Sequence, residues 1–246
     1  MKPLTWLLAS VLLYSVSMVA LMPASVFNIF IKQYVGSEFQ ISQTRGTVWQ
    51  GSGNVPGMGM AHWQVHVWAL LLGRVHVTLM QDALHVTPVH AGSVSPPTDI
   101  WLSPSSVHVE HMVLMLPVEL LSRRIASLKK MHLGGQFSIS ADQLILGPAI
   151  TGRMVVYWLN ATTALSPIGP VGTYQLLLMG QGDHVQLQLT TLNGPLVMSG
   201  NGRWSRHSGL QFSGIGQSAQ EQLAALLNLI GQPIGNNTYS IRVFAS

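Results

Sequence analysis

Hydrophobic and polar positions divide the chain into an uncharged N-terminal segment and a long region of two-residue alternation. Leu4–Met22 carries no charge, and the uncharged stretch runs from Pro3 to Ile31, a total of 29 residues. As a helix it would match the roughly 30 Å hydrocarbon core of a bilayer. It is also longer than the apolar region of a cleaved signal peptide, about 7–15 residues. The pattern predicts an uncleaved membrane anchor over residues 1–31, with a signal peptide or a buried core helix as alternatives.

After the anchor, apolar residues alternate with polar ones. This period of two is typical of antiparallel strands with one buried and one wet face. The apolar members of the alternating segments are Trp63, Val65 and Val67; Val75, Val77 and Leu79; Val185, Leu187 and Leu189; and Tyr239, Ile241 and Val243. The sequence therefore predicts a mainly β protein with an elongated antiparallel sheet.

Two segments interrupt the alternation with helical spacing. The first covers residues 117–130, with Pro117 in its first turn and lysines at its end. The second begins with the capping-box pattern Ser218-Ala-Gln-Glu221 and stops at Gly231. The two helices begin about 100 residues apart, which favours two β-plus-helix repeats, 32–130 and 131–246.

Composition narrows the class of protein. Only 8% of the residues are charged, against about 25% in a usual soluble domain. The net charge of +4 comes from dispersed residues, so a nucleic-acid partner is not predicted. The absence of Cys excludes disulfides and thiolate sites. An anchor followed by strands with Gln, Ser, Thr and His on their wet faces accounts for the low charge.

The sequence contains no recognised catalytic motif. It has no P-loop, no His-Glu-x-x-His and no two acidic residues close in sequence. Histidines such as His62, His66 and His76 would permit a metal site, but they also suit wet strand faces. The prediction is a non-enzymatic protein without catalytic, cofactor-binding or metal-binding residues.

A set of Gly and Trp motifs, in order along nearly the whole chain, resembles the type II secretion system protein N family. It begins with Leu-Met-Pro-Ala-Ser25 and Gly-Thr-Val-Trp-Gln-Gly51, and ends with Asn193-Gly-Pro-Leu. The residues that carry it are Pro23, Gly46, Trp49, Gly51, Trp68, Gly73, Gly152, Trp158, Asn160, Gly172, Tyr174, Gly194 and Pro195. The tryptophans are expected to pack in the core, the glycines to form turns or bulges, and Asn160 to hydrogen-bond a turn backbone.

The resemblance implies a single-pass protein of the bacterial inner membrane with most of the chain in the periplasm. Its partners would be other secretion subunits, in the inner-membrane platform and the secretin, and its role would be docking or assembly for the export of folded exoproteins. The family also looks like the periplasmic lipid-conducting proteins of the AsmA type. The alternative function is therefore binding or conduction of lipid in an apolar groove through Val75/Val77, Leu187/Leu189 and Ile241/Val243.

Overall fold

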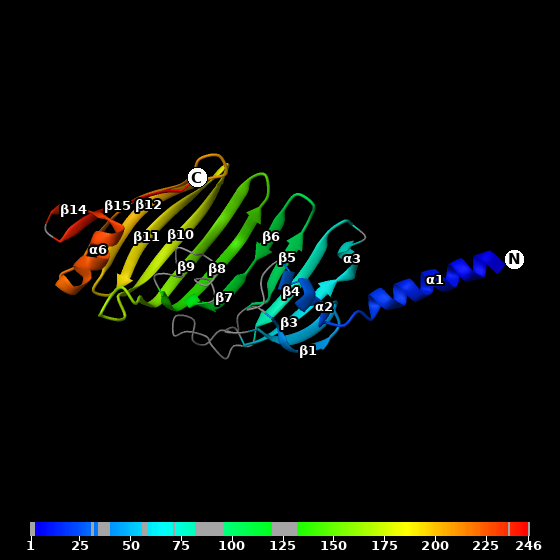
Figure 1. Cartoon of the computed structure of the whole chain (residues 1–246). Coiled ribbons are helices and arrows are strands. Elements are labelled where there is room, and N and C mark those ends of the chain that lie inside the picture. The colour runs from blue at the N-terminus through cyan, green and yellow to red at the C-terminus, as the bar shows by residue number, and fades with distance from the viewer. Residues whose placement is uncertain are drawn as a thin grey trace. The chain divides into compact units, whose positions relative to one another are not determined.

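The protein is mainly β and forms two compact units, Met1–Pro97 and Thr98–Ser246. A computed structural model describes residues 3–30, 32–33, 40–55, 59–70, 72–81, 96–119, 132–235 and 237–245. The strands within each unit are antiparallel (Figure 1). The predicted boundary between repeats at residue 130 lies outside the described residues, so the duplication stays a prediction.

The described part of the first unit holds helical segments and neighbouring strands in the order β1-β2-β3-β4. Its elements are α1 (Pro3–Ala20), α2 (Val26–Phe30), β1 (Ser42–Gly46), β2 (Gln50–Val55), β3 (Gly59–His66), α3 (Val67–Leu70) and β4 (Val75–Gln81). Trp63 pairs with Leu79 and Val65 with Val77, on one face of the sheet. The Phe27 ring of α2 meets the Trp63 ring edge to face, with centroids 5.4 Å apart, so α2 covers part of this apolar face.

Helix α1 exposes large apolar side chains on all of its sides. They are Trp6, Leu7, Leu8, Val11, Leu12, Leu13, Tyr14, Val16, Met18 and Val19. Among the residues that the structure describes, no helix combines the length and apolar character expected of a membrane span. The anchor predicted for residues 1–31 therefore stays a prediction.

The second unit is a sheet whose strands follow chain order except near its ends. Its order is β5-β6-β8-β9-β10-β11-β12-β13-β15-β14, and β7 also pairs with β8. The strands are β5 (Thr98–Leu102), β6 (Val107–Glu110), β7 (Met112–Pro117), β8 (Gly134–Leu146), β9 (Ile150–Thr162), β10 (Gly172–Gly182), β11 (His184–Asn193), β12 (Val197–Ser205), β13 (Gly209–Gln217), β14 (Gln232–Gly235) and β15 (Thr238–Ala245). Figure 1 shows β8 to β12 side by side.

The register gives this second sheet one apolar and one polar face. Cross-strand neighbours on one face form a row from β7 to β15, in the order Met112, Ala141, Met154, Leu178, Leu187, Gly202, Phe212 and Val243. The adjacent row on the other face is mainly polar, in the order Asp142, Arg153, Met179, Gln186, Arg203, Gln211 and Phe244. The predicted alternation over Val185–Leu189 and Tyr239–Val243 is confirmed.

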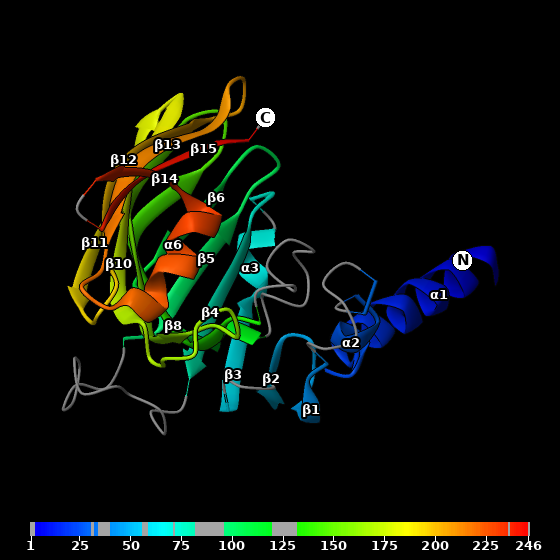
Figure 2. The ribbon, with the colours of Figure 1, turned by 60° about the vertical axis from the view of Figure 1, so that its left-hand side comes forward.

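A short helical segment covers one end of the apolar face (Figure 2). It consists of the 3₁₀ turn η4 (Glu221–Leu223) and α6 (Ala224–Ile230). Its buried leucines form a core with residues of the sheet and of the loops at the strand ends: Leu223, Leu226, Leu227, Ala161, Val171, Tyr174, Leu196 and Tyr239. The predicted second helix and its end at Gly231 are confirmed.

The two predicted helix starts differ from the structure in detail. Pro117 is the last residue of β7, where it pairs with Gln136, and the helical residues begin one position later, at Val118 and Glu119. Among the described residues β7 pairs only with β8, and an edge strand tolerates a residue without an N–H. Most of the remaining predicted helix lies outside the described residues. Ser218 is not the N-cap of the second helix, because Gln220 takes that position. The Ser218 hydroxyl instead accepts a hydrogen bond from the Gln220 N–H at 3.1 Å.

Candidate functional site

The first group of motif residues joins α1 to the sheet of the first unit; we call residues 21–25 and 46–51 together the anchor junction. The Ala24 N–H donates to the Gly46 carbonyl at 3.1 Å, and the Val48 N–H donates to the Met22 carbonyl at 2.9 Å. Pro23 forms an isolated bridge with Thr47. The indole N–H of Trp49 donates to the Val19 carbonyl at 2.9 Å, in the last turn of α1, where the same carbonyl also accepts the Met22 N–H at 3.3 Å.

Close packing explains the glycines of the anchor junction. Gly46 has φ +86°, in the left-handed region that glycine adopts without steric cost. A Cβ on Gly51 would lie 2.6 Å from both the Arg45 carbonyl oxygen and the Trp63 ring. The Trp63 indole N–H donates to the Thr47 carbonyl at 3.2 Å. The two motif segments, well separated in sequence, therefore form one hydrogen-bonded structure.

The second group, the Tyr174 cluster, consists of Trp158, Asn160, Gly172, Tyr174, Gly194 and Leu196. The Tyr174 hydroxyl donates to the Leu196 carbonyl at 3.0 Å, with the Val171 carbonyl at 3.3 Å. The Trp158 ring stacks obliquely on the Tyr174 ring, and its N–H donates to the Gly134 carbonyl at 3.0 Å. The cluster ties the ends of β8 to β11 together beneath η4 and α6.

Among the motif residues, Tyr174 has a shifted pKa. Its side chain is buried, and burial disfavours the charged phenolate. Burial raises the pKa of Tyr174 well above its usual value of about 10. The residue therefore acts as a neutral hydrogen-bond donor, which is a structural role.

We expect Tyr174→Phe to lower the free energy of unfolding by about 1–2 kcal/mol, because buried carbonyls lose their donor. Hydrogen exchange of the amides of β10 and β11 in the full chain measures the change. Tyr157→Phe is the matched control, because Tyr157 lies beside Trp158 on the opposite face of β9. Equal effects of the two substitutions would contradict the role given to the Tyr174 hydroxyl.

The raised pKa of Tyr174 also predicts a pH dependence. Its contribution to stability is complete below pH ~10 and falls as the pH rises above that value, because the unfolded chain ionises while the folded chain keeps its proton. The unfolding free energy of the wild type should therefore decline more steeply above pH ~10 than that of Tyr174→Phe. Parallel curves for the two proteins would contradict the prediction.

Other motif residues lie apart from these groups or act differently from expectation. Trp68 is exposed on α3, so the prediction that it packs in the core from a strand is wrong. Gly73 is in the turn after α3 with φ +68°, and Gly152 has φ +105° opposite a bulge in β8. Asn160 contributes a left-handed backbone, φ +49°, and its N–H donates to the Thr173 hydroxyl at 3.3 Å. Pro195 lies in the turn between β11 and β12.

Some residues in contact with these two groups are not among the motif residues of the family resemblance. Trp63 contacts Thr47 and Gly51 of the anchor junction, and in the sequence only its place in an alternating segment predicts that it is buried. Val171 and Ala161 are bonded to the Tyr174 cluster through the backbone. The Val171 N–H donates to the Ala161 carbonyl at 2.7 Å, and the Leu196 N–H donates to the Val171 carbonyl at 3.0 Å. These contacts could not be predicted from the sequence, because a backbone hydrogen bond does not depend on the type of side chain.

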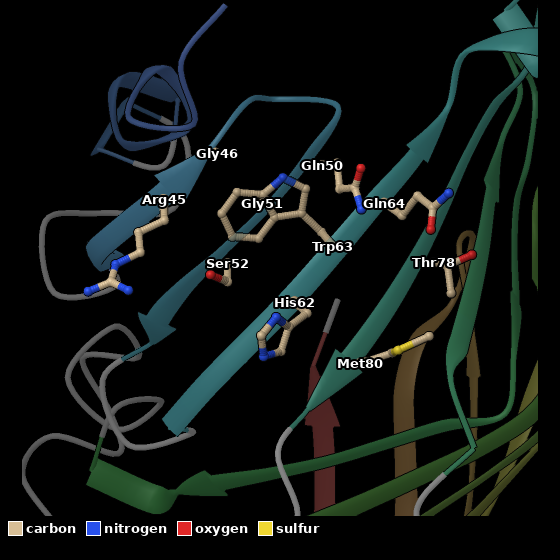
Figure 3. A pocket seen from close by; sticks show the side chains of 10 residues that line it. All are labelled: Arg45, Gly46, Gln50, Gly51, Ser52, His62, Trp63, Gln64, Thr78 and Met80. Carbon is tan, nitrogen blue, oxygen red and sulfur yellow. The ribbon is translucent and has the colours of Figure 1, made fainter.

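A hollow of about 430 Å³ lies on the sheet of the first unit (Figure 3). Its lining residues are Arg45, Gly46, Gln50, Gly51, Ser52, His62, Trp63, Gln64, Thr78 and Met80. No carboxylate is among them, so the hollow offers no acid–base pair for hydrolysis. Its lining is more apolar than polar, and it includes a single guanidinium, that of Arg45.

The histidines of the first unit follow the wet face of β3 and β4. The His66 ring stacks on the His76 ring at 4.2 Å, and His66 Nε2 lies 3.0 Å from the Thr78 hydroxyl. Across the described residues, no group of three or more His, Asp or Glu side chains gathers in a metal-binding arrangement. His85 and His90 lie outside those residues.

Comparison with known proteins gives one match. The family model of type II secretion system (T2SS) protein N matches residues 37–242, most of the chain and most of both units. No curated protein and no solved structure matches significantly. The matched region holds the strands of both units except the end of β15, together with the Tyr174 cluster and most of the predicted motif residues. The chain belongs to the type II secretion system protein N family.

Proposed function

We propose that this chain is a non-enzymatic, single-pass inner-membrane subunit of the type II secretion system. Its β-units would lie in the periplasm and dock other subunits, in the inner-membrane platform and the secretin, during export of folded exoproteins. Family membership supports a secretion component. The exposed apolar side chains of α1 support the membrane placement, because lipid would cover surface that water does not favour.

A docking role fits the chemistry of the motif residues. In the anchor junction and the Tyr174 cluster they make backbone hydrogen bonds, tight turns and ring contacts. Burial keeps the Tyr174 phenol neutral by raising its pKa, so it is no general base. These residues would hold the shape of a partner-binding protein.

The observation that carries the docking proposal is the edge of β15. Strand β14 pairs with β15 only at Thr238, Tyr239 and Ser240, whereas β13 pairs with β15 as far as Ala245. On the β14 side, residues 241–245 have no partner strand among the described residues, and Val243 and Phe244 are exposed. A strand edge of this kind can accept an extended segment of another protein.

Photocrosslinking in cells tests the edge directly. A photoreactive phenylalanine in place of Phe244 should form adducts with another secretion subunit. The same group at Gln186 is the control, because Gln186, Arg203, Gln211 and Phe244 form one row on the same face. It lies roughly 14 Å from Phe244, three strand spacings into the sheet.

We expect adducts at position 244 and not at position 186. Adducts at both positions, or at neither, would contradict docking at the β15 edge. Phe244→Lys should reduce exoprotein secretion, because a lysine on an open edge disfavours strand pairing. Unchanged secretion in a strain that lacks the gene would contradict a necessary role in export.

A second function, AsmA-like binding or conduction of lipid, is supported by the apolar face of the second unit. Leu187 and Phe212 on this face are only partly buried, and Val243 is exposed. Among the described residues of this unit, the helical segment of η4 and α6 lies over one end of this face. Lipid extraction of the purified full chain tests the proposal; finding no co-purified phospholipid would contradict it.

A further inference from the structure

We propose that α3 is a second membrane contact, whose apolar side chains enter the lipid headgroup region beside α1. This inference rests on the proposed anchoring of α1 in the bilayer. It assigns the connection between β3 and β4 a ligand of stated chemistry, the phospholipid surface itself.

The connection has the wrong composition for a hairpin end in water. Turns between strands are normally rich in Gly, Asn, Asp and Ser. Here residues 67–72 read Val-Trp-Ala-Leu-Leu-Leu, an uncharged apolar run. Trp68 is 78% exposed and Leu72 is 79% exposed, while Val67 and Leu70 are exposed to 45% and 40%. Transfer of such apolar side chains from water into lipid lowers the free energy of the system.

The position of α3 beside α1 favours lipid as the ligand of its apolar side chains. An open apolar hollow of about 450 Å³ is lined by Val16 and Val19 of α1, by Trp49, and by Val67 and Leu70 of α3. The exposed apolar surface of α1 therefore continues across this hollow onto α3. The hydrogen bond from the Trp49 indole to the Val19 carbonyl, 2.9 Å, holds α1 against the sheet at this point.

The residues around the run suit a headgroup region. Tryptophan is enriched where hydrocarbon meets water, and a short apolar element there enters to a depth of about 5–10 Å. Arg74 follows the run, is exposed, and donates its backbone N–H to the Ala69 carbonyl at 3.0 Å. A guanidinium in the headgroup region would attract the phosphates of anionic lipids.

The absence of native cysteine makes a depth measurement direct. The full chain would be reconstituted in vesicles of phosphatidylcholine and phosphatidylglycerol, with one environment-sensitive fluorophore on a single introduced cysteine. Quenching by phosphatidylcholine with a doxyl group near the headgroup reports contact with lipid. The test positions are Trp68→Cys and Leu72→Cys, both exposed, so neither substitution removes a buried side chain.

Two further positions separate the outcomes. Met80→Cys lies toward the far end of β4 and is 53% exposed, so it is the matched control in water. Ser10→Cys lies in the middle of α1 and reports the anchor; for this position the quencher is phosphatidylcholine with a doxyl group deep in its acyl chain, because the middle of a spanning helix lies near the bilayer centre. We expect quenching at positions 68 and 72 to be at least about threefold that at position 80, because only the former reach the interface.

Quenching at position 10 without quenching at 68 and 72 would overturn the α3 contact and leave the anchor standing. It would also be the result if α3 instead bound a protein partner, because the vesicles contain none. Quenching at 68 and 72 without quenching at 10 would overturn the anchoring of α1 and keep the lipid contact of α3. No quenching at any of these positions would overturn both proposals.

Discussion

Replacing Gly194 with alanine is expected to destabilise the second unit by about 3 kcal/mol or more. Gly194 has φ +128°, a conformation that side chains rarely adopt. A Cβ there would lie 2.8 Å from the Val171 carbonyl oxygen and 3.0 Å from the Gly172 nitrogen. Both atoms are backbone, and the Val171 carbonyl already accepts the Leu196 N–H. The cluster cannot yield without breaking its own hydrogen bonds.

Gly182→Ala is the matched control for Gly194→Ala. Gly182 also has a positive φ, +84°, but a Cβ there meets no atom within 4 Å. Its substitution should cost about 1 kcal/mol, the price of the backbone conformation alone. Hydrogen exchange of the amides of residues 172–193 in the full chain measures both variants. Equal costs would show that the contact with Val171 and Gly172 contributes nothing.

The strands of the second unit could be predicted because its sheet has two unlike faces. Val185, Leu187 and Leu189 alternate with Gln186 and Gln188 since one face is apolar and the other is wet. The same rule failed after His66. Val67 would continue the alternation in the sequence, but it is the first residue of α3 (Val67–Leu70). A short apolar run does not by itself separate helix from strand.

The motif residues could be found in the sequence, but their partners could not. Pro23 meets Thr47, and the Tyr174 hydroxyl meets the Leu196 carbonyl. Both contacts depend on strand register and on the path of the connecting turns, which no residue type encodes locally. Pro117 pairs with Gln136 as the last residue of β7, so the helix signal that it carries takes effect one residue later, at Val118.

The second large effect is expected at Leu227 of α6, where alanine should cost about 3 kcal/mol of unfolding free energy. The Leu227 side chain is buried, and its Cδ2 lies 2.8 Å from the position of a Cβ built on Gly216. Gly216 pairs with Met198 on one side and with Tyr239 on the other. The leucine therefore fills a hole in the sheet that the glycine leaves between two large side chains. Leu229→Ala, on an exposed residue of the same helix, should change stability by less than about 0.5 kcal/mol.

A double-mutant cycle between Leu227 and Gly216 tests this packing more sharply than either single variant. Gly216→Ala alone should cost about 1–3 kcal/mol, because its methyl group would overlap Leu227 and lie 3.1 Å from Ile241 Cδ1. In the Leu227→Ala background the new methyl group enters vacated space, so its cost should fall by at least about 1 kcal/mol. Gly216 has an ordinary backbone conformation that alanine adopts without strain, so the cycle isolates the side-chain contact. Additive costs in hydrogen exchange of β13 and β15 would mean that α6 does not pack on the sheet through this glycine, and that the apolar face is open there as well.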